Sequence, residues 1–260
     1  MNISKVTAVF FSPAGGTKKV VRAFVSALPY LAEDLDLTPF AKRLESRSFG
    51  GDELVVFAVP VYAGRIAPLA AERLVHMRGS RTPVVCLAVY GNRAYEDALL
   101  ELTALARQKG FVPFAAAAAV TQHSIMGRVA AGRPDGQDKE NLSFFARRVS
   151  TKLAEAQNPQ DLTVPCVPGS LPYKPYKAVG FVPFALSSCI RCGRCAALCP
   201  AGAISLADPR QTDAARCTFC MGCVRICPVG AREVDKEKLH SAEAIFVQKF
   251  GARRELEFFL

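Results

Sequence analysis

The 260-residue sequence predicts an α/β protein that has a doubly wound parallel sheet followed by a small cysteine-rich α+β domain. Three observations support this prediction. Apolar segments alternate with segments of helical periodicity at the start of the chain, a proline-rich stretch follows, and eight of the ten cysteines then lie between 189 and 227. Alternating helices and near-continuous apolar strands are typical of a parallel sheet that is covered on both faces.

Composition and length exclude several classes of protein. A chain of 260 residues buries an ample core without disulfides, so ten cysteines do not indicate a disulfide scaffold. The opening "MNISKVTAVFF" has one basic residue and no signal-peptide pattern, and no apolar run reaches the length of a membrane span. We therefore expect a soluble protein of a reducing cytoplasm.

The elements of the first domain follow from apolar patterning. "ISKVTAVFF" is an apolar, β-branched run that suits a buried parallel strand, and Val20, Val21, Phe24 and Leu28 then recur at helical spacing. Similar reasoning predicts strands at 3–11, 34–38, 53–59, 83–90 and 111–120, and helices from 17 to 28, up to about 109, and over 136–156. Cys86 lies within an apolar strand and is expected to be a small buried side chain.

The turn between the first strand and the first helix indicates an anion site. Ser12, Gly15, Gly16 and Thr17 place free backbone N–H groups and the positive end of a helix dipole at one point. The segment is neither a Walker loop nor a dinucleotide fingerprint, because GxxxxGK and GxGxxG are both absent. A plain tight turn between a strand and a helix is the alternative interpretation.

Ligands of open parallel sheets bind at the carboxyl ends of the strands, where the strand order reverses. Three loops are expected at that edge, at Ser12–Thr17, Pro60–Arg65 and Tyr90–Tyr95, and they combine a phosphate turn, glycines and aromatic rings suited to FMN. The predicted FMN-binding residues are Ser12, Ala14, Gly15, Gly16, Thr17, Pro60, Val61, Tyr62, Gly64, Arg65, Tyr90, Gly91, Asn92 and Tyr95. His123 and Ser124 follow the last strand and could reach the flavin rim, although capping of a loop turn is the favoured interpretation.

The cysteines form an internal duplication. "CIRCGRCAALCP" (189–200, the first repeat) maps onto "CTFCMGCVRICP" (217–228, the second repeat). In a CxxCxxCxxxCP run, three cysteines hold one iron–sulfur cube and the fourth ligates the cube of the other half. The first thiolate set is therefore predicted to be Cys189, Cys192, Cys195 and Cys227, and the second thiolate set Cys199, Cys217, Cys220 and Cys223.

A pair of structural zinc sites is the main alternative for these cysteines. Zinc sites take four ligands from two CxxC pairs, which explains neither the third closely spaced cysteine nor the CP ending. The spacing follows the bacterial ferredoxin run, and residues 185–237 resemble a bacterial ferredoxin with two [4Fe-4S] clusters.

A wider resemblance now follows. "FFSPAGGTKKV", "VPVYAGRIAP" and the paired ferredoxin motif together resemble the flavodoxin–ferredoxin fusion proteins of anaerobic bacteria known as the EFR1 family. The resemblance covers nearly the whole chain and implies a flavodoxin-like FMN domain followed by a ferredoxin-like domain. One departure is Ala14, which stands where flavodoxins commonly have a hydroxyl residue, so one side-chain bond to phosphate is missing.

We divide the chain into a flavodoxin-like domain (1–157), a proline-rich connector (158–184), a ferredoxin-like domain (185–237) and a C-terminal tail (238–260). The connector is expected to be stiff and to wrap one domain onto the other. The tail ends in Phe258, Phe259 and Leu260 and is expected to dock across the seam between the domains. Cys166 lies in the connector without a recognisable catalytic partner.

These features predict an electron-transfer protein that links one-electron and two-electron redox partners, with no legible acid, base or substrate pocket. The alternative is an FMN-dependent reductase of a small organic acceptor, with Tyr62, Arg65, Asn92 and Arg93 around the acceptor. The net charge of +10 does not indicate nucleic-acid binding, because basic residues are scattered. Thiolates, cluster cores and phosphate reduce that charge to roughly +4.

The remaining positive charge predicts a redox protein partner that is acidic, such as a ferredoxin or flavodoxin. The basic residues expected to matter flank the redox centres: Arg191, Arg194, Arg216, Arg225, Arg65 and Arg93. The alternative is that these arginines only solvate the surface or neutralise their own clusters.

Overall fold

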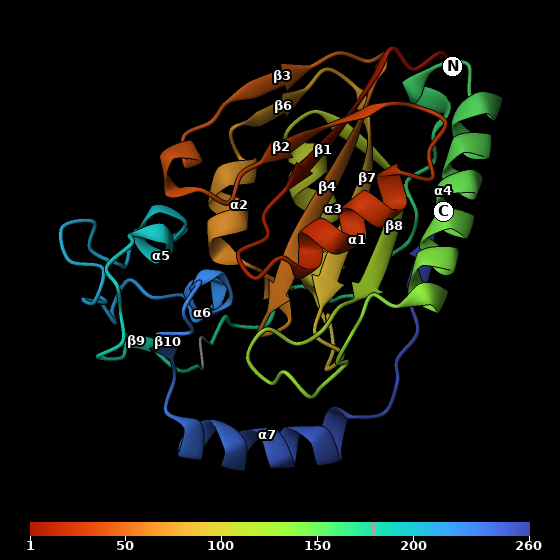
Figure 1. Cartoon of the computed structure of the whole chain (residues 1–260). Coiled ribbons are helices and arrows are strands. Elements are labelled where there is room, and N and C mark those ends of the chain that lie inside the picture. Colours follow the sequence, from red (N-terminus) through yellow and green to blue (C-terminus); the bar gives the residue numbers. More distant parts are fainter. Residues whose placement is uncertain (178–179) are drawn as a thin grey trace.

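A computed structural model of the chain describes residues 1–177 and 180–260. Its centre is a parallel sheet of five strands, in which each long strand is almost entirely buried (Figure 1). The strands are β1 (Lys5–Phe10), β2 (Ala32–Asp36), β4 (Glu53–Tyr62), β7 (Thr82–Tyr90) and β8 (Phe111–Val120). These confirm the predicted strands, with β4 three residues longer than expected at its carboxyl end.

The order of the strands identifies the fold. Neighbouring strands run β8-β7-β4-β1-β2, and all four pairings are parallel. Counted along the chain, the five strands therefore lie in the order 2-1-3-4-5, which is the flavodoxin-like order. The carboxyl ends of β4, β7 and β8 point toward the cysteine-rich segment and the C-terminal helix (Figure 1).

Helices cover both faces of the sheet. α1 (Gly16–Val25) and α4 (Gly136–Glu155) pack together, with the rings of Phe24 and Phe145 5.4 Å apart. α3 (Ala98–Gln108) lies on the opposite face (Figure 1). α2 (Pro68–Leu74), which the sequence did not predict, follows the short strand β5 (Arg65–Ile66).

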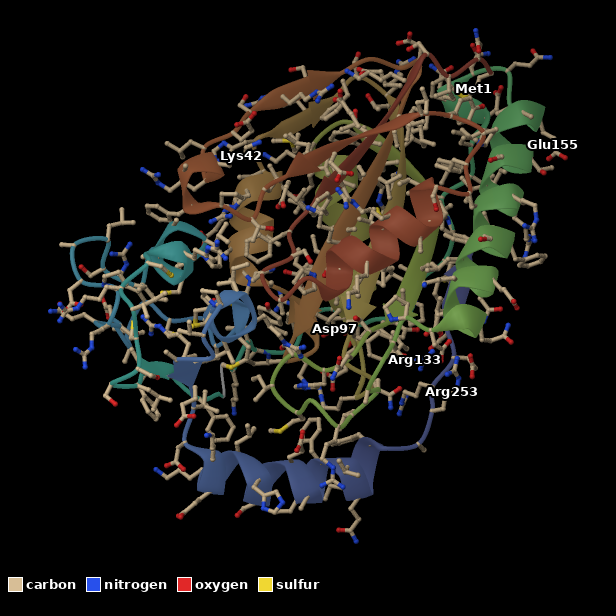
Figure 2. The ribbon with its side chains drawn as sticks, viewed as in Figure 1. Met1, Lys42, Asp97, Arg133, Glu155 and Arg253 are labelled. Carbon is tan, nitrogen blue, oxygen red and sulfur yellow. The ribbon has the colours of Figure 1, made fainter. Side chains whose placement is uncertain are left out.

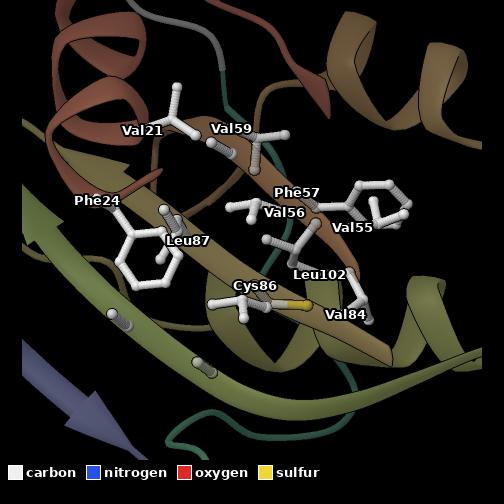
Figure 3. Packing of buried hydrophobic residues seen from close by; sticks show 14 of the residues in the cluster. Val21, Phe24, Val55, Val56, Phe57, Val59, Val84, Cys86, Leu87 and Leu102 are labelled. Atoms are coloured by element: carbon white, nitrogen blue, oxygen red, sulfur yellow. The ribbon is translucent and has the colours of Figure 1, made fainter. Parts of the chain in front are cut away.

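The apolar core lies on both faces of the sheet, under α1 on one face and under α3 on the other (Figure 3). Val56, Phe57 and Leu87 are within 1% of complete burial, as expected for strands that have helices on both faces. Cys86 is fully buried among them, which confirms its predicted role as a small core residue. Burial raises the pKa of the Cys86 thiol well above its usual range, so the thiol stays protonated and unreactive.

Smaller elements surround this core. β3 (Arg47–Phe49) pairs with β6 (Met77–Gly79), and 3-10 turns occupy Phe40–Lys42 and Pro159–Asp161. In the cysteine-rich segment, β9 (Phe184–Ala185) pairs with β10 (Arg232–Glu233), and each cysteine repeat contains a short helix. These helices are α5 (Arg194–Ala197) and α6 (Gly222–Ile226).

The C-terminal tail returns to the sheet. α7 (Lys236–Phe250) crosses beneath the carboxyl ends of the strands, and β11 (Glu257–Phe259) then pairs antiparallel with β8 as the edge strand (Figure 1). Phe258 stacks on Phe145 of α4 at 4.7 Å. The tail therefore docks on the edge of the flavodoxin-like sheet, and the prediction that its last residues fill the domain seam was wrong. At the edge of the sheet, the apolar terminus gains backbone pairing with β8 and an aromatic neighbour.

Arg133, which precedes α4, and Arg253 of the tail lie close together (Figure 2). Arg253 bonds Asp135 at 2.6 Å and Asp138 at 3.2 Å, and buried Arg133 also pairs with Asp138. The arginines fix the tail against the N-terminus of α4, where the Asp135 side chain accepts a bond from the Asp138 N–H. Within the described ranges, no helix has the length and apolar character needed to cross a membrane.

Replacement of Phe258 by Ala is expected to lower the free energy of unfolding by about 1–3 kcal/mol, because a half-buried ring loses its stacking partner and its apolar contact. Urea denaturation followed by circular dichroism measures the loss. Phe144→Ala, on the half-exposed neighbouring ring of α4, is the control and is expected to change stability by no more than about 0.5 kcal/mol. Equal losses in both variants would contradict a stabilising role for β11.

Candidate cofactor-binding site

The phosphate turn (Ser12–Thr17) has the backbone that an anion site needs. Gly15 has φ of 84°, a left-handed conformation that favours glycine, and α1 begins at the next residue. Among the described residues, the backbone N–H groups of Ala14, Gly16 and Thr17 have no protein acceptor. The Ser12 Oγ accepts from the Lys18 N–H at 2.9 Å, which leaves its own hydrogen free to be donated. These donors suit a phosphate at the N-terminus of α1.

Thr121 adds a hydroxyl that the sequence analysis missed. It follows β8, and its Oγ1 lies only 2.6 Å from the position that a Cβ atom at Gly16 would occupy. Strand β8 is distant in sequence from the turn, so only the parallel sheet brings the two together. Thr121 thus stands beside the turn in which Ala14 lacks a hydroxyl group.

A cavity of about 690 Å³, named here the central cavity, opens from the phosphate turn along the carboxyl ends of the strands. A volume of this size is typical of a small-molecule or cofactor site. Eight of the predicted FMN-binding residues line it: Ser12, Ala14, Gly16, Thr17, Pro60, Val61, Tyr62 and Gly91. The central cavity therefore joins all three loops that were expected at this edge of the sheet.

Six of the predicted residues do not line the central cavity. Gly15 shapes the turn, and Gly64 and Arg65 lie in the β4–β5 hairpin and beside α3. Tyr90 is buried against Tyr95, whose hydroxyl donates to Glu257 of the tail at 2.7 Å. The Asn92 amide donates to the carbonyls of Phe250 and Ala252. These side chains bind the tail and the connector, which the local sequence gave no means to foresee.

The side chains of Asp97 and Arg65 bind the connector along the same edge of the sheet. Asp97 is labelled in Figure 2. Asp97 accepts from the backbone N–H groups of Lys174 at 2.8 Å and Ser170 at 3.0 Å, and these bonds lower the pKa of its carboxyl. Arg65 forms two bonds to Glu101, at 2.7 Å each, and donates to the Lys174 carbonyl. The next three connector residues, Pro175 to Lys177, line the central cavity.

His123 caps a turn, which confirms the favoured interpretation of this residue, and it also lines the cavity. Its Nδ1 accepts from the backbone N–H groups of Ile125 and Met126, at 3.2 and 3.0 Å. Burial, followed by the charge of Arg93, lowers the pKa of His123 to about 4. A neutral imidazole whose Nδ1 accepts must carry its hydrogen on Nε2, and His123 is therefore a fixed hydrogen-bond donor at neutral pH.

The backbones of the two cysteine repeats match position by position. Residues in the left-handed region recur 28 positions apart, with similar φ values in each pair: Arg191 and Phe219 (53° and 55°), Gly193 and Met221 (75° and 61°), and Gly202 and Gly230 (58° and 62°). The fourth cysteine of each repeat accepts an N–H bond at 3.2 Å, Cys199 from Ala203 and Cys227 from Ala231. The duplication in sequence is therefore also a duplication in structure.

The electrostatics of the thiols link Cys199 to the second repeat. Burial, and then repulsion by neighbouring thiolates that include Cys199, raises the pKa of Cys220 to about 11 and of Cys223 to about 12. Burial and the charge of Cys199 also raise the pKa of Cys217. Cys199 thus lies near the three cysteines with which the crossed scheme pairs it, and all four thiols would need to lose protons to bind a metal.

Within residues 1–177 and 180–260, no three His, Cys, Asp or Glu side chains converge closely enough to hold one metal ion. A cubane makes a different demand on its ligands. Each of its four iron atoms takes one thiolate, so the four sulfur atoms surround a volume and do not meet at one point. The thiol-rich composition and the crossed arrangement of the second thiolate set suit such a cluster.

The second repeat and the phosphate turn are in direct contact. A Cβ atom at Gly222 would lie 2.8 Å from the Pro13 carbonyl oxygen, so only glycine permits this approach. Thr218, Phe219 and Arg225 of the second repeat line the central cavity. Burial, and then the nearby Cys220 thiolate, raises the pKa of Tyr62, a residue of the same cavity. The second thiolate set is therefore the one beside the cavity.

Comparison with protein families matches residues 188–231 to the 4Fe-4S dicluster domain. This segment is a ferredoxin-like 4Fe-4S domain. It follows a sheet with the flavodoxin-like strand order, so the chain has a flavodoxin–ferredoxin arrangement, as the sequence predicted. A search of curated proteins found no match.

Several solved structures are similar to the first part of the chain. A flavodoxin from Streptococcus pneumoniae has 16% identity and a TM-score of 0.39, over 57% of this chain and 99% of the flavodoxin. A flavodoxin, WrbA-like protein from Agrobacterium tumefaciens has 14% identity and a TM-score of 0.37, over 62% and 99%. The rubredoxin oxygen:oxidoreductase of the anaerobe Desulfovibrio gigas has 13% identity and a TM-score of 0.41, over 60% of this chain and only 38% of the oxidoreductase.

Replacement of Cys199 by Ala is expected to remove the cluster of the second thiolate set and leave the other cluster largely intact, because the crossed scheme pairs Cys199 with Cys217, Cys220 and Cys223 and its charge acts on all three. Iron analysis and electron paramagnetic resonance (EPR) of anaerobically prepared protein measure the loss. Cys227→Ala, the equivalent change in the other repeat, is the control and should remove the opposite signal. Loss of the first-set signal in Cys199→Ala would contradict crossed ligation.

Replacement of Gly15 by Asp is expected to weaken FMN binding at least roughly tenfold, because a carboxylate would stand beside the phosphate at the helix N-terminus. Gly15→Asn is the matched control. It has the same shape and tolerates the left-handed backbone, and it lacks the charge. Fluorescence titration of the flavin-free protein measures both affinities. Equal affinities in the two variants would show that the phosphate binds elsewhere.

Proposed function

We propose that this chain is an electron-transfer iron–sulfur flavoprotein of the EFR1 type, with two [4Fe-4S] clusters and FMN. The observation that carries the proposal is that residues of the second repeat and of the phosphate turn line one cavity. When bound, the clusters would exchange single electrons, and FMN would exchange one or two. A redox protein partner and a two-electron acceptor could then be served by one chain.

The donors around the cavity suggest how this chain would hold FMN. The N–H groups of Gly16 and Thr17 and the hydroxyl of Ser12 would bind the phosphate, and the Thr121 hydroxyl, which donates to the Arg133 carbonyl at 3.4 Å, would have to turn toward the phosphate to join them. Pro60, Val61 and Tyr62 would lie along the ring system, together with Gly91 and the fixed Nε2 donor of His123. The turn has no second glycine signature for a pyrophosphate, which favours FMN over FAD or NAD.

The surroundings of the cavity favour a carrier over a reductase of a small organic acceptor. Arg65 and Asn92, two of the four residues suggested for an acceptor pocket, are occupied by Glu101 and by carbonyls of the tail. The connector and Phe246 of α7 line the cavity on the side away from the sheet. A protein partner would therefore have to exchange electrons through the ferredoxin-like domain.

The first repeat offers the accessible face for that partner. Cys192 is exposed, and the side chain of Ile190 is 62% exposed. Arg191 and Arg194 are exposed beside them, and no described carboxylate pairs with either. Two basic residues around one exposed redox centre suit an acidic one-electron carrier.

The other candidate arginines are less available for docking. Arg93 pairs with Glu96, Arg225 lines the cavity, and Arg216 donates to the Ala201 carbonyl. We therefore assign the docking role to Arg191 and Arg194.

Anaerobically purified protein is expected to contain about eight iron atoms and one FMN per chain, and its flavin should be reduced by an acidic ferredoxin. The rate of reduction should fall as salt rises, because the Debye length shrinks from about 30 Å at 0.01 M to about 8 Å at physiological ionic strength. Stopped-flow absorbance across a salt series measures the rate. Zinc in place of iron, or a colourless protein, would contradict the proposed function.

A charge-reversal pair sharpens the experiment. Arg191→Glu with Arg194→Glu should slow reduction by the acidic ferredoxin roughly tenfold at low salt. Arg147→Glu with Arg148→Glu makes the same change of charge on exposed residues of α4, away from the cysteine repeats, and should have a much smaller effect (Figure 1). Reduction by a small neutral dye should hardly respond to salt. A flat salt response with ferredoxin would exclude electrostatic docking.

A further inference from the structure

Three arginines of the chain are almost completely buried, and they differ in how their charge is balanced. Arg73, Arg133 and Arg232 are 2%, 5% and 2% exposed. Arg133 pairs with the carboxylate of Asp138, which is itself fully buried. Within the described residues, no carboxylate lies within ion-pair distance of Arg73 or Arg232. Burial lowers the pKa of Arg73, and the charges of Glu72 and Asp36 oppose this only from beyond ion-pair distance. A buried charge without a close partner is costly, so these two sites favour a further negative group nearby.

Arg73 joins the two halves of the molecule. It extends from α2 and donates to the carbonyls of Leu37 and Thr38 at the end of β2, while its guanidinium lies 5.0 Å from the ring of Phe11. On the other side it donates at 2.5 Å to the carbonyl of Pro200. Pro200 directly follows Cys199, which lies among the thiols of the second repeat. The buried cation is therefore held against the backbone of the residue that follows one ligand of the second thiolate set.

Arg232 has a more central position among the cysteines. It donates to the Pro209 carbonyl and the Thr212 hydroxyl, and its Nε has no partner. Its charge opposes the rise in the pKa of Cys217 and Cys223, yet the Pro209 carbonyl is also 4.0 Å from the Sγ of Cys195. Arg232 is thus near thiols of both sets, whereas Arg73 meets the cysteine-rich half at the carbonyl of Pro200, the residue after Cys199 of the second set.

We propose that Arg73 is a counter-charge for the cluster of the second thiolate set and makes that cluster easier to reduce than the cluster of the first set. The inference rests on the proposed function, because it requires both clusters. Reduction adds one negative charge to a cluster, and a fixed cation in a site shielded from water stabilises that added charge. The cations beside the first set, Arg191 and Arg194, are exposed and therefore screened by solvent.

The consequence is an ordered transfer of electrons through the chain. The first thiolate set has the exposed cysteine, and the second adjoins the central cavity. A higher reduction potential at the second set would favour electron transfer from the accessible face toward the cavity. Arg73 would raise the reduction potential of the second-set cluster through its charge, without itself gaining or losing electrons.

Redox titration of the holoprotein monitored by EPR tests the proposal, and Cys199→Ala identifies which signal belongs to which set. In the unaltered protein, the second-set cluster should have the higher midpoint potential. Arg73→Gln keeps hydrogen-bond donors and removes the charge, so it should shift the second-set potential to more negative values and leave the first-set potential in place. Arg73→Lys keeps the charge and should restore most of the original potential, even if thermal stability falls.

Arg216→Gln is the matched control, because Arg216 is an exposed arginine at the same seam, over the ring of Phe40. Its second-set potential should stay close to that of the unaltered protein. The proposal would be overturned if Arg73→Gln shifted the midpoint potentials of both clusters equally, or if Arg73→Lys shifted the second-set potential as much as Arg73→Gln does. Arg73 would then only hold the two domains together. A first-set cluster with the higher potential in the unaltered protein would overturn it without any variant. Absence of two cluster signals would instead contradict the proposed function.

Discussion

The contact between the second repeat and the phosphate turn is the constraint on which the rest of the structure depends. Gly222 begins α6 against the carbonyl of Pro13, and any larger residue would force the two loops apart. Electron transfer needs redox centres that lie close together. The thiols of the ferredoxin-like domain can lie beside the cavity only if the two domains meet at one edge of the flavodoxin-like sheet. The edge available is the carboxyl end of the parallel strands, where loops and not side chains of the core form the surface.

Three long-range attachments keep that edge in place. The connector is held by Asp97 and by the Arg65–Glu101 pair, the seam by Arg73, and the tail by β11 on the edge of the sheet. Connector and tail residues also line the cavity. The ferredoxin-like domain is small and has few buried apolar residues, so it depends on these attachments for its position.

Buried arginines have different partners in the flavodoxin-like half and near the cysteines. In the flavodoxin-like half, Arg133 and Asp138 balance each other and fix the start of α4 against the tail. Near the cysteines, the buried guanidinium groups of Arg73 and Arg232 donate to carbonyl oxygens and to the Thr212 hydroxyl, and among the described residues no carboxylate lies within ion-pair distance of either. This contrast indicates that a negatively charged group is part of the folded state of the cysteine-rich half.

The sequence by itself determined the features that depend on local spacing. The alternation of apolar and helical segments predicted the five parallel strands, the glycines at 15 and 16 predicted a turn with free N–H groups at the start of α1, and the repeated cysteine spacing predicted an internal duplication. Each of these is encoded within about thirty residues of continuous chain, where periodicity and turn chemistry act directly.

Only the tertiary structure decided which side chains face the cavity. Tyr90, Tyr95 and Asn92 had suitable chemistry and a suitable loop, yet they face the tail, and Thr121 and Phe219 reach the cavity from distant segments. The burial of Arg73 is equally invisible in sequence, because an arginine on a helix is usually solvated, whereas this one is enclosed by the end of β2, Phe11 and Pro200. Orientation and burial arise from contacts between segments far apart in the chain, and no local pattern specifies them.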